Sequence, residues 1–351
     1  MEYIKFNNFT KEKKHWINQI LHWYNKNKRD LLWRKPENQN FYGVWISEVM
    51  LQQTNVQTVE KYFLAFKKKW PNFNSFLDAN LNDILKIWQG LGYYQRAKNI
   101  HKTLQILRKK KINTTYNELI KLPGIGDYSA ASISAILNDQ NHAVVDGNIK
   151  RILSRVFDID SQSNKFNTQI YKKAKELTPN SGNGDYCQAL MDIGATICRP
   201  REVECNICPL TKFCDFFITK KKILKKKSVS KKKKIGIVFV YQFKNEIYIE
   251  KSRETFLHGL MKFETSDFLE YKSNDEYKNK KKLLNEKNYF ISKNVNLEFV
   301  EHHFTNFQLK LFIKAIRLKK KFYNPNGLWI SKKDFFNYPF SNLMIKVFKK
   351  I

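Results

Sequence analysis

Residues 119–151 constrain the fold more than any other stretch of this chain. Apolar residues lead into the tight turn Leu122-Pro123-Gly124-Ile125-Gly126, and a helical run follows over 128–137. Pro123 fixes one φ angle and the two glycines lack a Cβ, so a ligand can approach the backbone closely. The N–H groups at the start of the second helix point outward with the positive end of the helix dipole. The stretch therefore predicts a helical hairpin that can bind an anion such as a DNA phosphate.

Asp146 follows this hairpin and precedes a helix that begins near Asn148. Aspartate commonly caps helix N-termini, so Asp146 can have a purely structural role. Likewise, the glycines can belong to a plain turn between helices. The functional interpretation is a carboxylate held at a fixed distance from a phosphate anchor. This stretch alone leaves both interpretations open.

Residues 42–54 form a mostly apolar segment with one carboxylate, Glu48, in its middle. At helical spacing Val44, Glu48 and Leu51 share one face, which places the carboxyl group in apolar surroundings. Desolvation there raises the pKa of a carboxyl group, which suits a general acid that works near neutral pH. The alternative is a glutamate that is half exposed or paired with a buried arginine.

The rest of the first 216 residues is predicted to be helical, with helices at 16–24, 56–68, 81–88, 95–110, 168–177 and 185–193. A glycine turn at 90–94 carries two aromatic residues. The cysteines Cys198, Cys205, Cys208 and Cys214 then form the pattern C-x6-C-x2-C-x5-C. Four thiols this close indicate a metal site, and thiolates suit either zinc or an iron-sulfur cluster. Cys187 lies outside the pattern and is expected in the core.

A lysine-rich segment, 217–234, has ten lysines and no acidic residue, and reads as a solvated linker. Beyond it the hydrophobic period changes from 3.6 to 2, which indicates strands. The expected strands are 235–243, 246–250, 297–304 and 307–316, with a helix opening at 267–269. We therefore expect a mainly α domain at 1–216, a linker at 217–234 and a smaller α+β domain at 235–351.

The formal net charge of +32 favours a polyanionic partner, because lysines and arginines release counterions from nucleic acid. The sequence is also rich in Lys, Asn, Ile and Phe, a bias that an A+T-rich genome produces without selection for binding. The first 30 residues lack the apolar core of a signal peptide, and no run approaches the roughly 18 apolar residues that span a membrane. We expect an intracellular, cytoplasmic protein that associates with DNA and with no membrane.

The order of these features resembles the helix-hairpin-helix DNA glycosylase superfamily, in particular its iron-sulfur branch and the MutY-type adenine DNA glycosylases. The resemblance covers residues 40–215. It is carried by Ser47-Glu48-Val49-Met50-Leu51-Gln52-Gln53-Thr54, Gly90-Leu91-Gly92-Tyr93-Tyr94, Leu122-Pro123-Gly124-Ile125-Gly126, Val145-Asp146-Gly147-Asn148 and the four cysteines. It implies a six-helix barrel with a helix-hairpin-helix motif and an iron-sulfur cluster loop.

This resemblance implies an enzyme that flips adenine out of duplex DNA, where adenine is mispaired with 8-oxoguanine or guanine, and cuts its glycosidic bond. Glu48 would protonate the leaving base, and Asp146 would stabilise the sugar cation. Lyase relatives carry a nucleophilic lysine where this chain has Tyr128, and a phenol cannot form a Schiff base. A monofunctional glycosylase follows, in which Tyr128 lines the centre and Asn148 orients it. Lys150 could still trap an opened sugar in a side reaction.

The resemblance also implies that Gln53 and Tyr94 enter the base stack around the lesion pair, and that Leu122, Gly124 and Gly126 contact DNA. The four cysteines would hold one [4Fe-4S] cluster. Residues 235–351 resemble a MutT-like (Nudix-fold) lesion-recognition module without a pyrophosphatase box. In that module Thr305 and Asn306 stand in a stretch where Ser-His is expected, and Glu264 replaces a proline. We expect a monomer; no segment identifies a protein partner.

Two other functions fit parts of the pattern. One is a bifunctional endonuclease III-like glycosylase and lyase, which Tyr128 and the extra C-terminal domain disfavour. The other is a non-catalytic, metal-containing DNA-binding protein, which the carboxylates Glu48 and Asp146 disfavour. A binding protein should tolerate Glu48→Gln and Asp146→Asn without loss of its function.

Overall fold

The computed structural model describes residues 9–221, 231–252, 259–271, 275–285, 297–304 and 306–351, together with Ile4 and Ile223. The chain folds into two compact units. Unit 1 comprises Met1–Asp78 and Lys102–Lys226, and unit 2 comprises Ala79–His101 and Lys227–Ile351. This division differs from the sequence-based one, which placed Ala79–His101 with the N-terminal helices.

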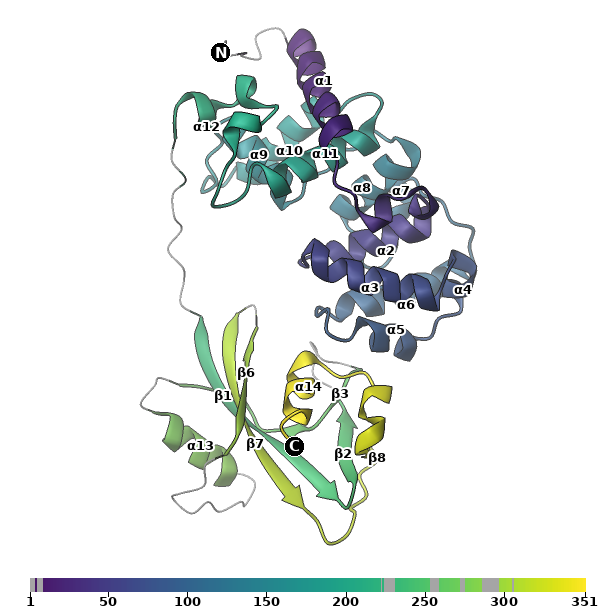
Figure 1. Ribbon diagram of the computed structural model, residues 1–351, viewed down its shortest axis with the longest axis vertical. Helices are drawn as coiled ribbons and strands as arrows, with labels where there is room; N and C mark the ends of the chain where they lie inside the picture. The colour runs from purple at the N-terminus through teal and green to yellow at the C-terminus, as the bar shows by residue number, and fades with distance from the viewer. Residues whose placement is uncertain are drawn as a thin grey trace. The chain divides into compact units, whose positions relative to one another are not determined.

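Unit 1 is helical, as Figure 1 shows. Its helices are α1 (Phe9–Asn27), α2 (Phe41–Leu51), α3 (Val56–Lys69), α4 (Phe73–Leu77), α7 (Tyr116–Leu119), α8 (Asp127–Asn138), α9 (Gly147–Val156), α10 (Phe166–Leu177), α11 (Asn183–Thr196) and α12 (Asp215–Ile218). Short 3₁₀ turns lie at Leu32–Arg34, Pro36–Asn38, Cys205–Ile207 and Thr211–Phe213. Helix α5 (Leu81–Trp88) belongs to unit 2, and α6 (Gln95–Leu107) runs from unit 2 into unit 1. The helices predicted between residues 16 and 193 are all present, most with ends within two or three residues of the expected ones.

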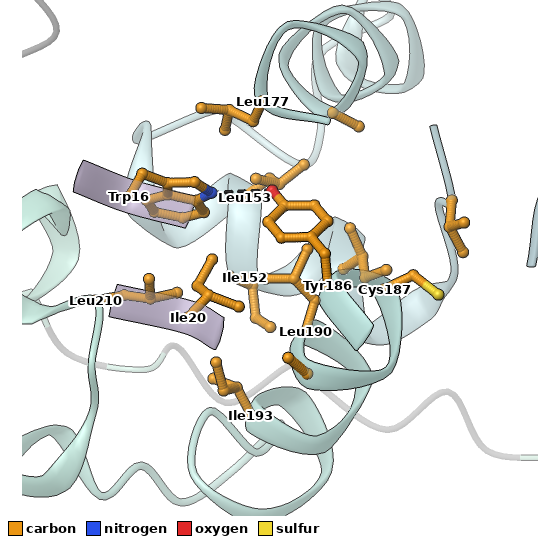
Figure 2. Close-up of a cluster of buried hydrophobic side chains, with 14 of the residues drawn as sticks. Trp16, Ile20, Ile152, Leu153, Leu177, Tyr186, Cys187, Leu190, Ile193 and Leu210 are labelled. Atoms are coloured by element: carbon orange, nitrogen blue, oxygen red, sulfur yellow. Dashed lines mark hydrogen bonds between the residues drawn. The ribbon is translucent and has the colours of Figure 1, made fainter. Parts of the chain in front are cut away.

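The core of unit 1 joins α1, α9 and α11, as Figure 2 shows. Trp16 and Ile20 lie one turn apart on α1 and are both fully buried. The indole Nε1 of Trp16 donates a hydrogen bond to the hydroxyl of Tyr186 at 2.9 Å. Ile152 and other apolar residues of α9 and α11 fill the space around this pair. This packing fixes α9, the helix that Asp146 precedes, against α11.

A buried ion cluster fixes the segment after α1 against α11. The side chain of Asp192 is fully buried and accepts hydrogen bonds from Arg34 Nη1 at 2.7 Å and Nη2 at 2.9 Å. Arg29 Nε donates to the same carboxylate at 2.7 Å. Burial alone would raise the pKa of Asp192, but the hydrogen bonds and charges of the two arginines hold that pKa below its ordinary value. The paired arrangement holds the guanidinium of Arg34 in place beside α2.

Unit 2 contains a mixed sheet of eight strands in the described residues. They are β1 (Lys232–Phe243), β2 (Glu246–Lys251), β3 (Met261–Lys262), β4 (Glu264–Thr265), β5 (Leu269–Glu270), β6 (Phe299–His303), β7 (Phe307–Arg317) and β8 (Gly327–Ser331). The main path is β3-β2-β1-β7-β6, in which β1 and β7 pair in parallel from Lys232 opposite Phe307 to Gln242 opposite Arg317. The other strand pairs are antiparallel.

Alternate residues of β1 contribute to two separate cores. Val238 and Val240 pack with residues of α14 (Asn342–Phe348). Ile237 and Phe239 pack on the other face, with Leu283 of α13 (Glu276–Asn285). This period of two is the pattern from which the strands were predicted, and it confirms an α+β domain after the lysine-rich segment.

Several expectations for the C-terminal part need correction. The helix expected to open at 267–269 is wrong, because Leu269 and Glu270 form β5 and pair with β1, while the helix starts at Glu276. The expected linker also overlaps α12 at one end and β1 at the other. Strand β8 and helix α14 were not predicted. Among the described residues, none of the helices has both the length and the apolar character needed to cross a membrane.

Candidate active site

Glu48 lies in the middle of α2, a helix whose residues from Phe41 to Met50 are all buried. Asn40 caps this helix, because its Oδ1 accepts a hydrogen bond from Gly43 N at 3.1 Å. Glu48 is 6% exposed, and its Oε2 has no hydrogen-bond partner in the part of the chain that the structure describes. The burial expected from the sequence is therefore present, but polar and charged groups as well as apolar ones surround the carboxyl group.

Burial is the main reason that the pKa of Glu48 rises from 4.5 to about 7. The nearby charge of Asp146 raises the pKa further. The hydroxyls of Tyr128 and Ser132 and the positive charge of Arg34 act in the opposite direction. A carboxyl group with this pKa is protonated in a large fraction of the molecules near neutral pH and can donate its proton.

The carboxyl group lines a pocket within unit 1 that contains about 460 Å³ of space, part of it open to solvent. Trp33 and Leu51 supply apolar walls, and Arg34, Gln188 and Met191 supply polar or polarisable atoms. The amide Nε2 of Gln188 donates to the carbonyl of Gly184 at 3.2 Å, which leaves the amide oxygen as the atom that can accept from a ligand. The pocket thus combines apolar walls with an acid and an acceptor.

Asp146 is the N-cap of α9, as the structural interpretation predicts. Its Oδ1 accepts from Ile149 N at 2.7 Å, and its Oδ2 accepts from Asn148 Nδ2 at 2.8 Å. Burial raises the pKa of Asp146, and these hydrogen bonds oppose that rise. The cap does not exclude the functional interpretation, because Asp146 also lies close enough to Glu48 for its charge to act on the Glu48 pKa.

Tyr128 lies in the first turn of α8, near both carboxylates. Burial and the charges of Glu48 and Asp146 raise the pKa of its phenol well above the ordinary value. Its hydroxyl donates to Met191 Sδ, a residue of the pocket wall, at 3.3 Å. Four residues predicted as catalytic, namely Glu48, Tyr128, Asp146 and Asn148, are therefore brought together from three separate segments.

Arg151 links this centre to the cysteine loop. Its Nη2 donates to Asn148 Oδ1 at 2.8 Å, and its Nε donates to the carbonyl of Cys198 at 2.7 Å. The same guanidinium also donates to the carbonyl of Gly194 at 2.7 Å. Asn148 is thereby fixed on both sides, by Asp146 and by Arg151.

The four cysteines line one mostly apolar pocket, and none of them forms a disulfide. Arg155 Nη1 donates to Cys198 Sγ at 3.1 Å, and Cys214 Sγ lies 3.8 Å from the carbonyl oxygen of Arg155. Among the residues that the structure describes, no three ligand side chains surround a position for a single metal ion. The thiols thus converge on one pocket without converging on one point.

The hairpin between α7 and α8 has the expected form. Ile125 N donates to the carbonyl of Leu122 at 3.1 Å, and Gly124 has φ +80°. The first intrahelical bond of α8 runs from Ala130 N to Gly126 O, so the preceding N–H groups of the helix have no intrahelical acceptor. A Cβ at Gly126 would meet no atom within 4 Å, which leaves this backbone open to a ligand.

The remaining residues predicted to contact DNA differ in their exposure to solvent. Gln53 is exposed and has φ +60°, an uncommon conformation for a residue other than glycine. Tyr94 is only 6% exposed, and within unit 2 its hydroxyl donates to the carbonyl of Phe340 at 3.2 Å. The exposed aromatic of that turn is Tyr93, at 45%. Asn306 is exposed just before β7, and Thr305 lies outside the described residues.

Sequence reasoning missed five residues around the centre: Arg34, Ser132, Arg151, Gln188 and Met191. Two of these five residues could have been found from a signal in the local sequence. Ser132 lies one helical turn after Tyr128, and Arg151 lies one turn after Asn148, so each shares a face with a residue that was predicted. Arg34, Gln188 and Met191 carry no such signal, because they meet Glu48 only through the tertiary fold.

Comparison with known proteins agrees with this arrangement. A family model for the HhH-GPD superfamily of base excision DNA repair proteins matches residues 46–180, the span that holds Glu48, the hairpin and Asp146. An adenine DNA glycosylase from Buchnera aphidicola subsp. Schizaphis graminum is 40% identical over 246 residues, which cover 67% of this chain and 70% of the relative. The chain belongs to the adenine DNA glycosylase family.

Solved structures support the same fold. The structure of a thermostable thymine-DNA glycosylase aligns with a TM-score of 0.54 and 26% identity, and covers 61% of this chain and 100% of that protein. Endonuclease III from a non-covalent complex with DNA aligns with a TM-score of 0.50 and 18% identity, over 60% of this chain and 97% of that protein. At 18% identity, the similarity to endonuclease III shows a shared fold alone.

Proposed function

We propose that this chain is a monofunctional adenine DNA glycosylase that acts on adenine opposite 8-oxoguanine or guanine in duplex DNA. The observation that carries the proposal is Glu48, a buried carboxyl group with a raised pKa that lines a pocket and lies near a second carboxylate. Adenine is a poor leaving group until a ring nitrogen is protonated, and Glu48 supplies that proton. The target base must first leave the stack, which costs least for a mispair.

The pocket favours a flat base with an amino group. Trp33 and Leu51 bury the faces of such a ring, and the amide oxygen of Gln188 accepts from an exocyclic amino group. Arg34 is held by Asp192, so its position beside the base is fixed before binding. A buried acceptor without a donor is unfavourable, and hence the pocket would select against bases that lack the amino group.

Asp146 stabilises the oxocarbenium-like sugar that forms as the base departs, as a carboxylate does in glycoside hydrolysis. Its hydrogen bonds to Ile149 N and Asn148 hold it in the ionised form that this role needs. Tyr128 has no amine and so forms no Schiff base. The nearby amine, Lys150 Nζ, donates to Asn167 Oδ1 at 2.8 Å, so a lyase reaction would be only a side reaction.

The hairpin N–H groups and the net charge of +32 support binding of the DNA backbone. The strained, exposed backbone of Gln53 supports insertion of its side chain beside the lesion pair. Tyr94 could enter the stack only after it leaves its buried position in unit 2. Unit 2, with helices on both faces of a mixed sheet, would act as a MutT-like module that contacts the opposite base through Thr305 and Asn306.

The four cysteines would hold one [4Fe-4S] cluster. Their thiols line one mostly apolar pocket and form no disulfide, and four thiolates are the donor set that such a cluster takes. The cluster would hold the shape of the loop, and Arg155 would neutralise part of its charge through Cys198.

Cys208→Ser is expected to remove most of the iron and to weaken DNA binding by at least about tenfold, because the loop loses its metal core. Iron per chain and a binding titration with an A:8-oxoguanine duplex measure both effects. Cys187→Ala is the matched control, since Cys187 is a buried core residue outside the cluster loop. Wild-type protein that is purified anaerobically and holds zinc in place of iron would contradict the cluster assignment.

The pH dependence should follow the two carboxylates. Glu48 must be protonated, so the single-turnover rate is highest below its pKa of about 7 and falls about tenfold per pH unit above it. Asp146 must be ionised, so the rate should also fall at acidic pH. Because burial raises the Asp146 pKa, this fall should begin above the ordinary value of 3.8. A rate that stays constant from about pH 6 to about pH 9 would rule out Glu48 as the acid.

The substrate is tested with duplexes that carry adenine opposite 8-oxoguanine, guanine or thymine under single-turnover conditions. We expect release of adenine from the first two and little from the third, because a matched pair resists flipping. Equal rates on all three duplexes would contradict the proposed mispair specificity.

A further inference from the structure

Ser132 lies on α8 next to the acid and has no role assigned so far. The residue is fully buried, on the helix that packs against α2. Tyr128 and Ser132 are one helical turn apart on α8, so both hydroxyls face the same direction, toward Glu48. Two hydroxyl donors from one helix thus approach one carboxyl group from another.

The two donors differ in what they bind. The hydroxyl of Tyr128 donates to Met191 Sδ. The Oγ of Ser132 and the Oε2 of Glu48 are both buried, and within the described residues neither forms a hydrogen bond of ordinary geometry. The Ser132 hydroxyl is nevertheless near enough to Glu48 to lower its pKa as a donor. A buried hydroxyl and a buried carboxyl oxygen that are close together and both unpaired are unusual in proteins. Ser132 therefore has an uncommitted donor beside the group that changes charge.

We propose that Ser132 is a positioning residue for Glu48, and that its hydroxyl donates to the carboxylate that remains after Glu48 has given its proton to the base. The proton moves from the carboxyl group to a ring nitrogen of adenine, and Ser132 keeps its own proton throughout. A neutral acid needs no such donor, whereas a buried carboxylate does. The inference rests on the proposed role of Glu48 as the acid.

The other charged and titratable groups near Glu48 act differently. Arg34 donates through both terminal nitrogens to Asp192, so it acts on Glu48 through its positive charge, although its buried Nε has no hydrogen-bond partner among the described residues. Asp146 opposes ionisation of Glu48 through its own charge. Cys187 on α11 is buried and neutral, because burial raises its thiol pKa well above the ordinary value. The Tyr128 hydroxyl also acts as a donor toward Glu48, but it donates to Met191 Sδ, so Ser132 is the nearby hydroxyl with no other hydrogen bond when the charge appears on Glu48.

Ser132→Ala tests the proposal through the pH profile of single-turnover adenine release. Loss of a hydrogen bond to the carboxylate should raise the Glu48 pKa. The alkaline limb of the profile, where the rate falls as the pH rises, should therefore shift to a pH about one unit higher. The plateau rate should fall by about three- to tenfold, because a weaker acid transfers its proton more slowly. Ser132→Thr retains the hydroxyl and should keep the wild-type limb.

Ser134→Ala is the matched control. Ser134 lies on the same helix and is equally buried, but its hydroxyl donates to the carbonyl of Ala131 at 3.2 Å. The rate of the Ser134→Ala variant should fall at the same alkaline pH as that of the wild type. If Ser132→Ala shares the wild-type limb, the positioning role is wrong, even when its plateau is lower. If wild-type protein releases no adenine, the proposed function itself fails, and this result is distinct from an unshifted limb.

Discussion

Replacement of Glu48 by glutamine is expected to lower the single-turnover rate of adenine release by about 10²- to 10⁴-fold. Glutamine keeps the shape of the side chain and its polar atoms but cannot donate an acidic proton. Binding of the duplex should change little, because Glu48 lies in the base pocket and not at the hairpin. The rate is measured with enzyme in excess over an A:8-oxoguanine duplex, and binding is measured by titration.

The same variant should be more stable than the wild type at alkaline pH. The folded-state pKa of Glu48 is about 7 and the ordinary value is 4.5, so between these values the folded protein holds a proton that the unfolded chain releases. Wild-type stability therefore falls as the pH rises from about 4.5 to 7, and glutamine removes this loss. Glu176→Gln, in a surface pair with Lys173, is the control that should leave rate and stability nearly unchanged. A Glu48→Gln variant that is less stable above pH 7 would show that the carboxylate has an unrecognised partner.

Asp146→Asn is expected to lower the rate by about 10²- to 10³-fold, because the side chain loses the negative charge that stabilises the sugar cation. Asparagine is as good an N-cap as aspartate, so α9 should keep its start and the protein should keep its fold. The midpoint of urea unfolding and the single-turnover rate separate the two effects.

Asp139→Asn is the matched control for Asp146. Asp139 also accepts hydrogen bonds from backbone N–H groups, those of Gly182 and Asn183, but it does not line the pocket of Glu48. Its substitution should leave the rate within about twofold of the wild type. If Asp146→Asn also keeps the wild-type rate, Asp146 is a helix cap and nothing more.

The sequence predicted those features that depend on local pattern. The helix around Glu48, the glycine hairpin and the capped helix after Asp146 are each defined by residues close together in the chain. The change to a period of two after the lysine-rich segment predicted β1 and its two faces. The two interpretations of Asp146, which the sequence left open, are compatible in the structure, because the cap holds the carboxylate beside Glu48.

The features that escaped prediction depend on contacts between distant residues. Arg34 meets Asp192 across 158 positions, and Tyr128 meets Met191 across 63. No periodicity connects such pairs. The helix expected at 267–269 failed for a related reason, because pairing of Leu269 with Ile235 of β1 overrides the local preference. Likewise, Ala79–His101 groups with unit 2 through contacts that lie far apart in the sequence.

The most direct test of the account is the reaction of anaerobically purified protein with an A:8-oxoguanine duplex, with and without alkali, and with identification of the released base. We predict free adenine as the product, with a strand that stays intact until alkali breaks it. Glu48→Gln should give neither free adenine nor an alkali-sensitive strand. Strand breakage without alkali would show an amine acting at the sugar. Tight binding of the wild type with no released base would contradict the account, because the pocket around Glu48 would then not be catalytic.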